Sequence, residues 1–175
     1  MKNIFAFVVL LSVFTSNCYS QSCLWAKTAS CSGYCRGESV STDPSGNVYA
    51  TGGFTYSSSI TFDSITLLNT NIADYDIFIA KYDTEGNVLW AKSVGGGDLD
   101  IGYSVSTDTV GNVFVTGAFE SSTITFDTAT LTNTGVLNLF VTKYDTYGNL
   151  LWAKSANGPG QYVGNSIRTD RDGKV

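Results

Sequence analysis

Short runs of β-branched and aromatic residues recur along the chain after its first twenty residues. The runs near 38–42, 47–54, 77–82 and 87–92 are too short for helices and are rich in residues that favour strands. The runs near 77–82 and 87–92 are apolar at almost every position, which is typical of a sheet covered on both faces. The pattern therefore predicts an all-β chain whose sheets are stacked on one another.

One kind of turn, Asp-x-x-Gly, separates many of these runs. The aspartate can accept hydrogen bonds from the backbone of its own turn, and the glycine three residues later can take a positive φ. This is the chemistry of a hairpin built on a type I turn and a glycine bulge. One carboxylate per turn is too few for calcium, which takes about six to eight oxygens, so we interpret the turns as structural. They begin at Asp43, Asp83, Asp108, Asp145 and Asp170.

The chain repeats itself with a period of 62–65 residues. Leu-Trp-Ala-Lys occurs at 24–27, 89–92 and 151–154, which spaces its tryptophans by 65 residues (25 to 90) and then by 62 (90 to 152). Other segments recur in the same register: 39–43 matches 104–108 and 166–170, and 60–63 matches 124–127. Such self-similarity indicates a repeat architecture, with units at about 25–89, 90–151 and 152–175.

Four strands per repeat, stacked as sheets around an axis, make a β-propeller. We expect four-stranded antiparallel blades: two full repeats, a preceding last strand at 24–27, and a third repeat truncated at Val175. The ring is then incomplete, and we interpret the chain as an N-terminal fragment of a longer protein. The period exceeds the ~40–50 residues of common propeller repeats, and we expect residues 60–67 to form an extra short hairpin.

Two segments carry a specific resemblance. Asp-Ile-Phe-Ile-Ala-Lys-Tyr-Asp-x-x-Gly-Asn-Val-Leu-Trp-Ala-Lys-Ser at 76–93 resembles the SBBP β-propeller repeat of bacterial surface and secreted proteins. So does Ser-Val-Ser-Thr-Asp-x-x-Gly-Asn-Val-Phe-Val-Thr-Gly-Ala-Phe at 104–119, and the resemblance covers nearly everything from Leu24 to Val175. It implies a non-catalytic protein with no cofactor and supplies no catalytic residue. The C-terminal sorting module that often ends such proteins is not visible in this sequence.

The first twenty residues have the form of a secretory signal peptide. A basic start at Lys2 is followed by an apolar run from Ile4 to Phe14, which is too short to span a bilayer, and then by small and polar residues. We expect cleavage after Ser20, which leaves 21–175 as a partial propeller that is secreted or displayed on the cell surface, without a transmembrane segment. The alternative, acylation of Cys18, would require Asn17 just before a lipidated cysteine, where it is a poor residue.

Composition narrows the function classes. The chain has 10 Lys and Arg against 15 Asp and Glu, for a net charge of −5, which argues against nucleic acid as a partner. It has no His, and so lacks the commonest general base and the commonest zinc ligand. The absence of His therefore disfavours a hydrolytic or metal enzyme.

Antiparallel order within each blade predicts where a ligand binds. All Asp-x-x-Gly turns fall at one end of the strands, whereas the connections between repeats and the long middle connections fall at the other end. Those loops differ between repeats, and loops on a rigid scaffold are where binding usually resides. Our candidate ligand-face residues are Tyr34, Arg36, Asp98, Asp100, Asn157, Gln161 and Tyr162.

The cysteines, lysines and tryptophans each have a structural interpretation. Export favours disulfides, so Cys31 and Cys35 are a candidate pair; a bridge involving Cys23 and free thiols are the alternatives. We expect the repeated lysines to protect blade edges, with a ligand channel as the alternative; they are Lys27, Lys81, Lys92, Lys143 and Lys154. We expect the tryptophans to pack between blades, with a platform for stacking sugars as the alternative.

Two function classes remain open. The favoured one is a secreted or surface propeller that acts as a non-catalytic binding or structural module for a glycan or a protein. The alternative is an enzymatic propeller, either a quinoprotein-like dehydrogenase or an accessory domain of a secreted hydrolase. The Asp-x-x-Gly-Asn-x-Leu-Trp pattern loosely resembles the quinoprotein repeat, but Thr84-Glu85-Gly86-Asn87 departs from its usual Thr-Gly-Lys.

Overall fold

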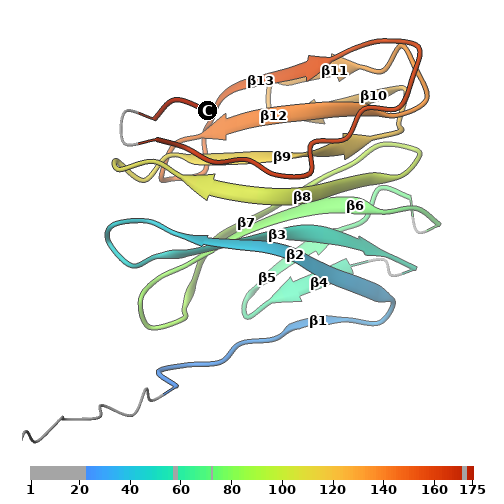
Figure 1. Ribbon diagram of the computed structural model, residues 1–175. Helices are drawn as coiled ribbons and strands as arrows, with labels where there is room; N and C mark the ends of the chain where they lie inside the picture. The colour runs from blue at the N-terminus through green and yellow to red at the C-terminus, as the bar shows by residue number, and fades with distance from the viewer. Residues whose placement is uncertain (1–22, 57–58, 72, 171–172) are drawn as a thin grey trace, which may run out of the picture.

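In a computed structural model the chain is described over residues 23–56, 59–71, 73–170 and 173–175, which form strands and connecting loops (Figure 1). The predicted signal peptide, its cleavage after Ser20 and the alternative acylation of Cys18 lie outside the described residues. Over the described ranges, no helix is long and apolar enough to cross a membrane.

Two four-stranded antiparallel sheets carry the two full repeats. Sheet 1 has the order β2 (Tyr34–Thr42), β3 (Val48–Thr55), β6 (Asp76–Tyr82), β7 (Val88–Val94). Sheet 2 has the order β8 (Asp100–Thr107), β9 (Val113–Phe119), β12 (Asn138–Tyr144), β13 (Leu150–Ala156). Figure 1 shows the two sheets as successive layers. The four strands predicted for the first full repeat are confirmed, although the first of them begins earlier than expected, at Tyr34.

A short hairpin is inserted between the second and third strands of each sheet. The first consists of β4 (Ser59–Phe62) and β5 (Ile65–Leu68), and the second of β10 (Thr123–Phe126) and β11 (Ala129–Thr132). Asp63 and Asp127 turn the corner with the same left-handed φ of 48°, which Asp tolerates better than most residues. A further strand, β1 (Ala29–Cys31), pairs with β4. The expected extra hairpin at 60–67 is thus confirmed.

The Asp-x-x-Gly turns have the expected conformation. Their glycines, Gly46, Gly86, Gly111, Gly148 and Gly173, have φ between 73° and 84°. In each turn the glycine N–H donates to the aspartate carbonyl oxygen at 2.9–3.1 Å. At Asp83, for example, Oδ1 accepts from the backbone N–H of Glu85 and Asn87, and Oδ2 accepts from the Asn87 side-chain amide. The carboxylate is therefore engaged by its own turn.

The main core lies between the two sheets. Its fully buried side chains include Ile77 and Ile79 from sheet 1 and Phe119 and Phe140 from sheet 2. Phe126 of β10 joins them, with its ring centroid 5.0 Å from that of Phe140. All seven residues of β6 are buried, so both faces of this strand are covered, as its apolar sequence predicted. The residues of β12 instead alternate between buried and half-buried.

A tryptophan over a glycine turn marks the step from one repeat to the next. Trp90 of β7 donates from Nε1 to the carbonyl oxygen of Thr146 at 3.2 Å, and its ring lies against Gly148. A Cβ added to Gly148 would lie only 3.1 Å from Cδ2 of Trp90. Trp25 repeats this arrangement one step earlier, with its Nε1 3.1 Å from the carbonyl oxygen of Thr84 and its ring on Gly86. The expectation that tryptophans pack between repeats is confirmed at both places.

Lysines reinforce the same step, and one expectation about them is wrong. Lys81 is only 4% exposed, so it does not protect a sheet edge; its Nζ donates to the carbonyl oxygen and to Oγ1 of Thr146 at 2.9 and 2.7 Å. Lys92 bridges to Asp127 at 2.9 Å. Lys27 makes the matching ion pair to Asp63, also at 2.9 Å. Each ammonium group thus joins the hairpin or turn of the following sheet.

Residues 24–27 do not form the predicted strand. A last strand pairs with the third strand of its own sheet, and the described residues contain no such partner for this segment. Trp25 and Lys27 nevertheless contact sheet 1 and its hairpin, through Thr84 and Asp63. Further along the chain, residues 163–170 lie beside β8 without forming a strand: Ile167 N–H and Thr169 N–H donate to Ser104 Oγ and Ser106 Oγ of β8. Gly164 N–H donates to the carbonyl oxygen of Gly117 on β9 at 3.2 Å.

Replacing Gly148 by Ala tests the step between repeats. We expect Gly148→Ala to lower the free energy of unfolding by about 2 kcal/mol, because the Cβ is strained at a φ of 84° and pushes against Trp90. The matched control is Gly97→Ala, since a Cβ at Gly97 has no neighbour within 4 Å. Urea denaturation of both variants measures the effect. Equal midpoints for Gly148→Ala and the wild type would contradict the packing described here.

Candidate functional site

The strand order places the variable loops together at one end of both sheets, which we call the loop end. It holds the connection from 95 to 99 between the sheets, the segments 69–75 and 133–137 that lead into β6 and β12, and the connection from 157 to 161. The opposite end, the turn end, holds the Asp-x-x-Gly turns. The division between a variable end and a uniform end follows from the antiparallel order of each sheet.

Hydrogen bonds tie neighbouring loops of the loop end to each other. Asn71 Nδ2 donates to the Gly97 carbonyl oxygen at 2.8 Å. Asp98 N–H donates to Ser121 Oγ at 3.0 Å, which links the connection between the sheets to the loop after β9. Further along, Tyr162 N–H donates to the Leu137 carbonyl oxygen at 2.7 Å. These bonds hold neighbouring loops together on the surface of the loop end.

Six of the seven predicted ligand-face residues are exposed on this surface. Tyr34 and Tyr162 are 55% and 38% exposed, and the side chain of Arg36 is 48% exposed. Asp98, Asn157 and Gln161 are exposed as well. Asn157 Oδ1 accepts from Asn138 Nδ2 at 2.8 Å, which anchors that loop to β12.

Asp100 departs from the prediction because it is completely buried at the start of β8. Its Oδ2 accepts from Gly96 N–H and from Ser121 Oγ, both at 2.8 Å. Asp76, also buried, accepts from Thr70 N–H at 2.6 Å. Burial raises the pKa of both carboxyl groups, that of Asp100 to about 7, and the negative charge of Asp76 contributes to the shift at Asp100. The buried carboxyl group of Asp100 therefore links the 95–99 connection to the loop after β9 and is not exposed to a ligand.

The disulfide bond also lies at the loop end. Cys31 and Cys35 form a disulfide that closes the segment leading into β2, while Cys23 is exposed and free. Gly33, inside this segment, lies so close to the backbone of Tyr56 that a Cβ there would clash with it. The disulfide thus packs the first loop against the end of β3.

Two hollows that the sequence did not predict lie along the first strands of the two sheets, β2 and β8, and the matching segment 166–170. We call these three segments the inner strands. One, of about 370 Å³, lies at the turn end and is lined by Thr42, Asp43, Pro44, Thr107, Asp108, Thr109, Thr169 and Asp170. The other, of about 270 Å³, is lined by residues 39–41, 104–106 and 166–168. The segments 39–43, 104–108 and 166–170 carry polar residues at the same positions. This recurrence establishes the repeats, and it is also the sequence signal for a polar hollow between them.

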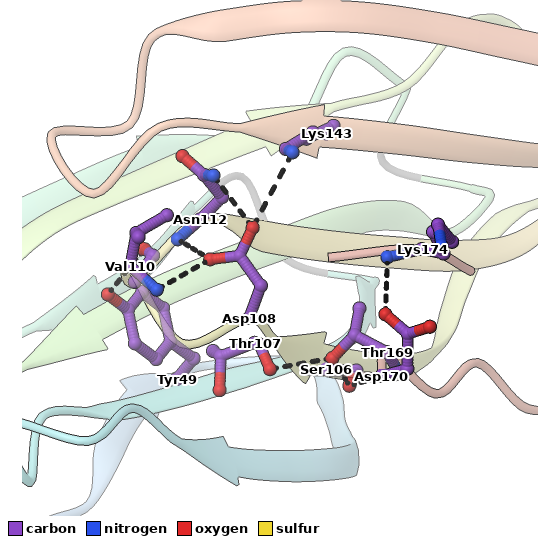
Figure 2. Close-up of polar contacts among 11 residues, drawn as sticks. Tyr49, Ser106, Thr107, Asp108, Val110, Asn112, Lys143, Thr169, Asp170 and Lys174 are labelled. Atoms are coloured by element: carbon purple, nitrogen blue, oxygen red, sulfur yellow. Dashed lines mark hydrogen bonds and ion pairs between the residues drawn. The ribbon is translucent and has the colours of Figure 1, made fainter. Parts of the chain in front are cut away.

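Hydroxyl groups connect these inner strands. Val105 N–H donates to Ser39 Oγ at 3.2 Å, and Ile167 N–H donates to Ser104 Oγ at the same distance one repeat later. Thr169 Oγ1 donates to the carbonyl oxygen of Thr107 at 2.6 Å. Figure 2 shows Thr169 beside Ser106 and Thr107. Serine and threonine side chains therefore replace a backbone ladder between repeats.

At the turn end the acidic groups are engaged within the protein. Asp108 accepts from Val110 N–H and Asn112 N–H and lies 3.5 Å from Lys143 Nζ (Figure 2). The hydrogen bonds to Asn112 and Val110 and the charge of Lys143 hold the pKa of Asp108 below its usual value, although burial opposes them. Within the described ranges, no group of three or more Cys, Asp or Glu side chains is placed to hold a metal ion.

Comparison with known proteins supports the repeat architecture. No family model matches the chain. The chain is 28% identical over 148 residues to an uncharacterised WD repeat-containing protein of Acanthamoeba polyphaga mimivirus. The match covers 78% of this chain but only 11% of that protein. Together with the stacked antiparallel sheets, this similarity indicates a β-propeller-like repeat protein.

The buried Asp100 predicts a pH dependence of stability. Its carboxyl group has a pKa of about 7 in the folded chain, against about 3.9 when unfolded, so its contribution is fully present at acid pH and is lost as pH rises through 7. We expect the free energy of unfolding to fall by roughly 2 kcal/mol between pH 5 and pH 8.

The variant Asp100→Asn removes the titrating group and should flatten this profile. Asp98→Asn, in the same loop but exposed, should retain the wild-type profile. Urea denaturation across the pH range measures both variants. A wild-type profile in Asp100→Asn would show that another group causes the pH dependence.

Proposed function

We propose that the chain is part of an exported, non-catalytic β-propeller of SBBP-like blades that binds a partner through its loop end. The observation that carries this proposal is the gathering of the variable loops at one end of two stacked sheets. The uniform turns occupy the other end. A rigid scaffold with variable loops on one face is the usual arrangement of a binding module.

Three further observations support the proposal. The Trp-on-glycine contact occurs twice, from Trp90 of sheet 1 onto sheet 2 and from Trp25 of the preceding segment onto sheet 1, which is what a repeated contact between blades would give. The relative is a WD repeat-containing protein, which favours a binding role. Export is supported by the apolar segment after Lys2, in a chain with cysteines paired as Cys31–Cys35.

Binding at the loop end is tested by removing exposed side chains from each end in turn. The full chain is immobilised and exposed separately to the exported proteins and to the surface glycans of the producing cells. We expect Tyr34→Ala/Tyr162→Ala to reduce the captured material at least fivefold. Tyr147→Ala, which removes a 79% exposed tyrosine from the turn end, should capture as much as the wild type. Equal losses in both variants, or capture of nothing, would contradict the proposal.

Export makes a separate prediction about the mature N-terminus. Expression with the native leader in a bacterial host should release a chain that begins at Gln21, with a net charge of −6, because Lys2 is the only charged residue removed (−5 − 1). Amino-terminal sequencing and intact-mass measurement check this. A chain that retains Met1 in the cytoplasm would contradict export, and a lipid on Cys18 would favour the alternative anchor.

A further inference from the structure

The first repeat departs from the second at a group of positions at the loop end. The side chain of Arg36 is 48% exposed and Tyr56 is 73% exposed, whereas Ile101 and Ser121 at the matched positions of the second repeat are almost completely buried. Four aromatic or charged residues replace aliphatic or small ones: Tyr34 for Leu99, Arg36 for Ile101, Tyr56 for Ser121 and Tyr75 for Leu137. The general repeat pattern does not require these residues.

Several features hold these side chains in place. Tyr34 lies inside the loop closed by Cys31 and Cys35, and its ring meets that of Tyr75 edge-on with centroids 6.3 Å apart. The Tyr75 ring occupies the space that Gly53 leaves free, since a Cβ on Gly53 would lie 2.9 Å from it. Tyr56 has a left-handed φ of 52°, which is uncommon for a bulky residue. A strained, cross-linked arrangement of exposed aromatic groups indicates a preorganised binding surface.

Two β-bulges add polar and aromatic groups to the same place. The register of β2 with β3 shifts at Glu38, and that of β8 with β9 shifts at the matched residue Tyr103. Glu38 forms an ion pair with Arg36, so this pair carries no net charge. Burial raises the pKa of the Tyr75 hydroxyl group above its usual value, and the charges of Arg36 and Glu38 also act on that pKa. Tyr103 lies on the neighbouring strand β8, at the bulge that matches Glu38. We call this group the tyrosine patch: Tyr34, Arg36, Glu38, Tyr56, Tyr75 and Tyr103.

The tyrosine patch continues into the second hollow described above. The residues that follow Glu38 and Tyr103 in the chain, 39–41 and 104–106, line this hollow of about 270 Å³ together with 166–168. Five of its nine lining residues are serines: Ser39, Ser41, Ser104, Ser106 and Ser166. We call it the serine groove. An aromatic platform therefore leads directly into a channel rich in hydroxyl groups.

We propose that the tyrosine patch and the serine groove together bind a neutral polysaccharide chain. Tyrosine rings present apolar faces against which the C–H faces of sugar rings can pack, and their hydroxyl groups donate and accept hydrogen bonds. The Arg36–Glu38 pair places a donor and an acceptor side by side for sugar hydroxyls without favouring a charged ligand. The hydroxyl groups of Ser39 and Ser104 in the serine groove accept hydrogen bonds from the backbone of the next repeat and keep an O–H donor for the following sugar units. Arg168 is the one charged residue in the lining and supplies further donors. This inference rests on the proposed function and names the class of ligand that the loop end would bind.

Affinity electrophoresis and calorimetry with defined hexasaccharides test the inference. The probes are cellohexaose, xylohexaose and mannohexaose, which are neutral, and hexagalacturonate, which is anionic. We expect the full chain to bind at least one neutral hexasaccharide with millimolar or tighter affinity and hexagalacturonate at least tenfold more weakly. Tyr34→Ala and Tyr103→Ala should each weaken binding about tenfold.

Tyr147→Ala is the matched control, because it removes an exposed tyrosine at the turn end and should leave the affinity unchanged. Urea denaturation of each variant shows that it remains folded. Failure of all three neutral probes, unchanged binding in both patch variants, or a preference for hexagalacturonate would overturn the inference. If a protein is captured through the loop end while no saccharide binds, the saccharide inference fails and the proposed function stands.

Discussion

The contact of Trp90 with the turn at Gly148 joins two sheets that share no backbone ladder. The indole ring needs a flat surface, and the glycine supplies it because it has no side chain and holds a left-handed φ. The same contact brings the Thr146 carbonyl oxygen within reach of both Trp90 Nε1 and Lys81 Nζ. The spacing of the sheets, the burial of the intervening aromatic core and the position of the loops all depend on this step.

Much of the fold could be predicted because its determinants are local. Asp-x-x-Gly fixes each turn through hydrogen bonds within five residues, and the apolar runs identify the strands. The burial of Lys81 was not predictable in this way, because its acceptors belong to Thr146, 65 residues away. The strand expected at 24–27 failed for a related reason: the local sequence favours a strand, but strand formation requires a neighbour.

The candidate site shows the same division between local and distant causes. Exposure of Tyr34, Asp98 and Gln161 followed from their place in variable loops. Asp100 looks equivalent in sequence but is buried, because Ser121 from the loop after β9 and Gly96 from its own loop enclose its carboxylate. The serine groove was missed because three segments, each unremarkable alone, create it only when stacked. Recurring polar positions on an inner strand therefore indicate where stacked repeats leave a hollow, as well as the register of the repeats.

The step between repeats has a direction. Trp90, Lys81 and Lys92 reach forward from one repeat, and Thr146, Gly148 and Asp127 receive them on the next. Trp25 and Lys27 reach forward in the same way toward Thr84 and Asp63. The groups that reach forward and the groups that receive them therefore lie on different parts of each repeat. A repeat unit can present both sets at once, one to the unit before it and one to the unit after it, while its loops at the other end of the strands take no part in these contacts.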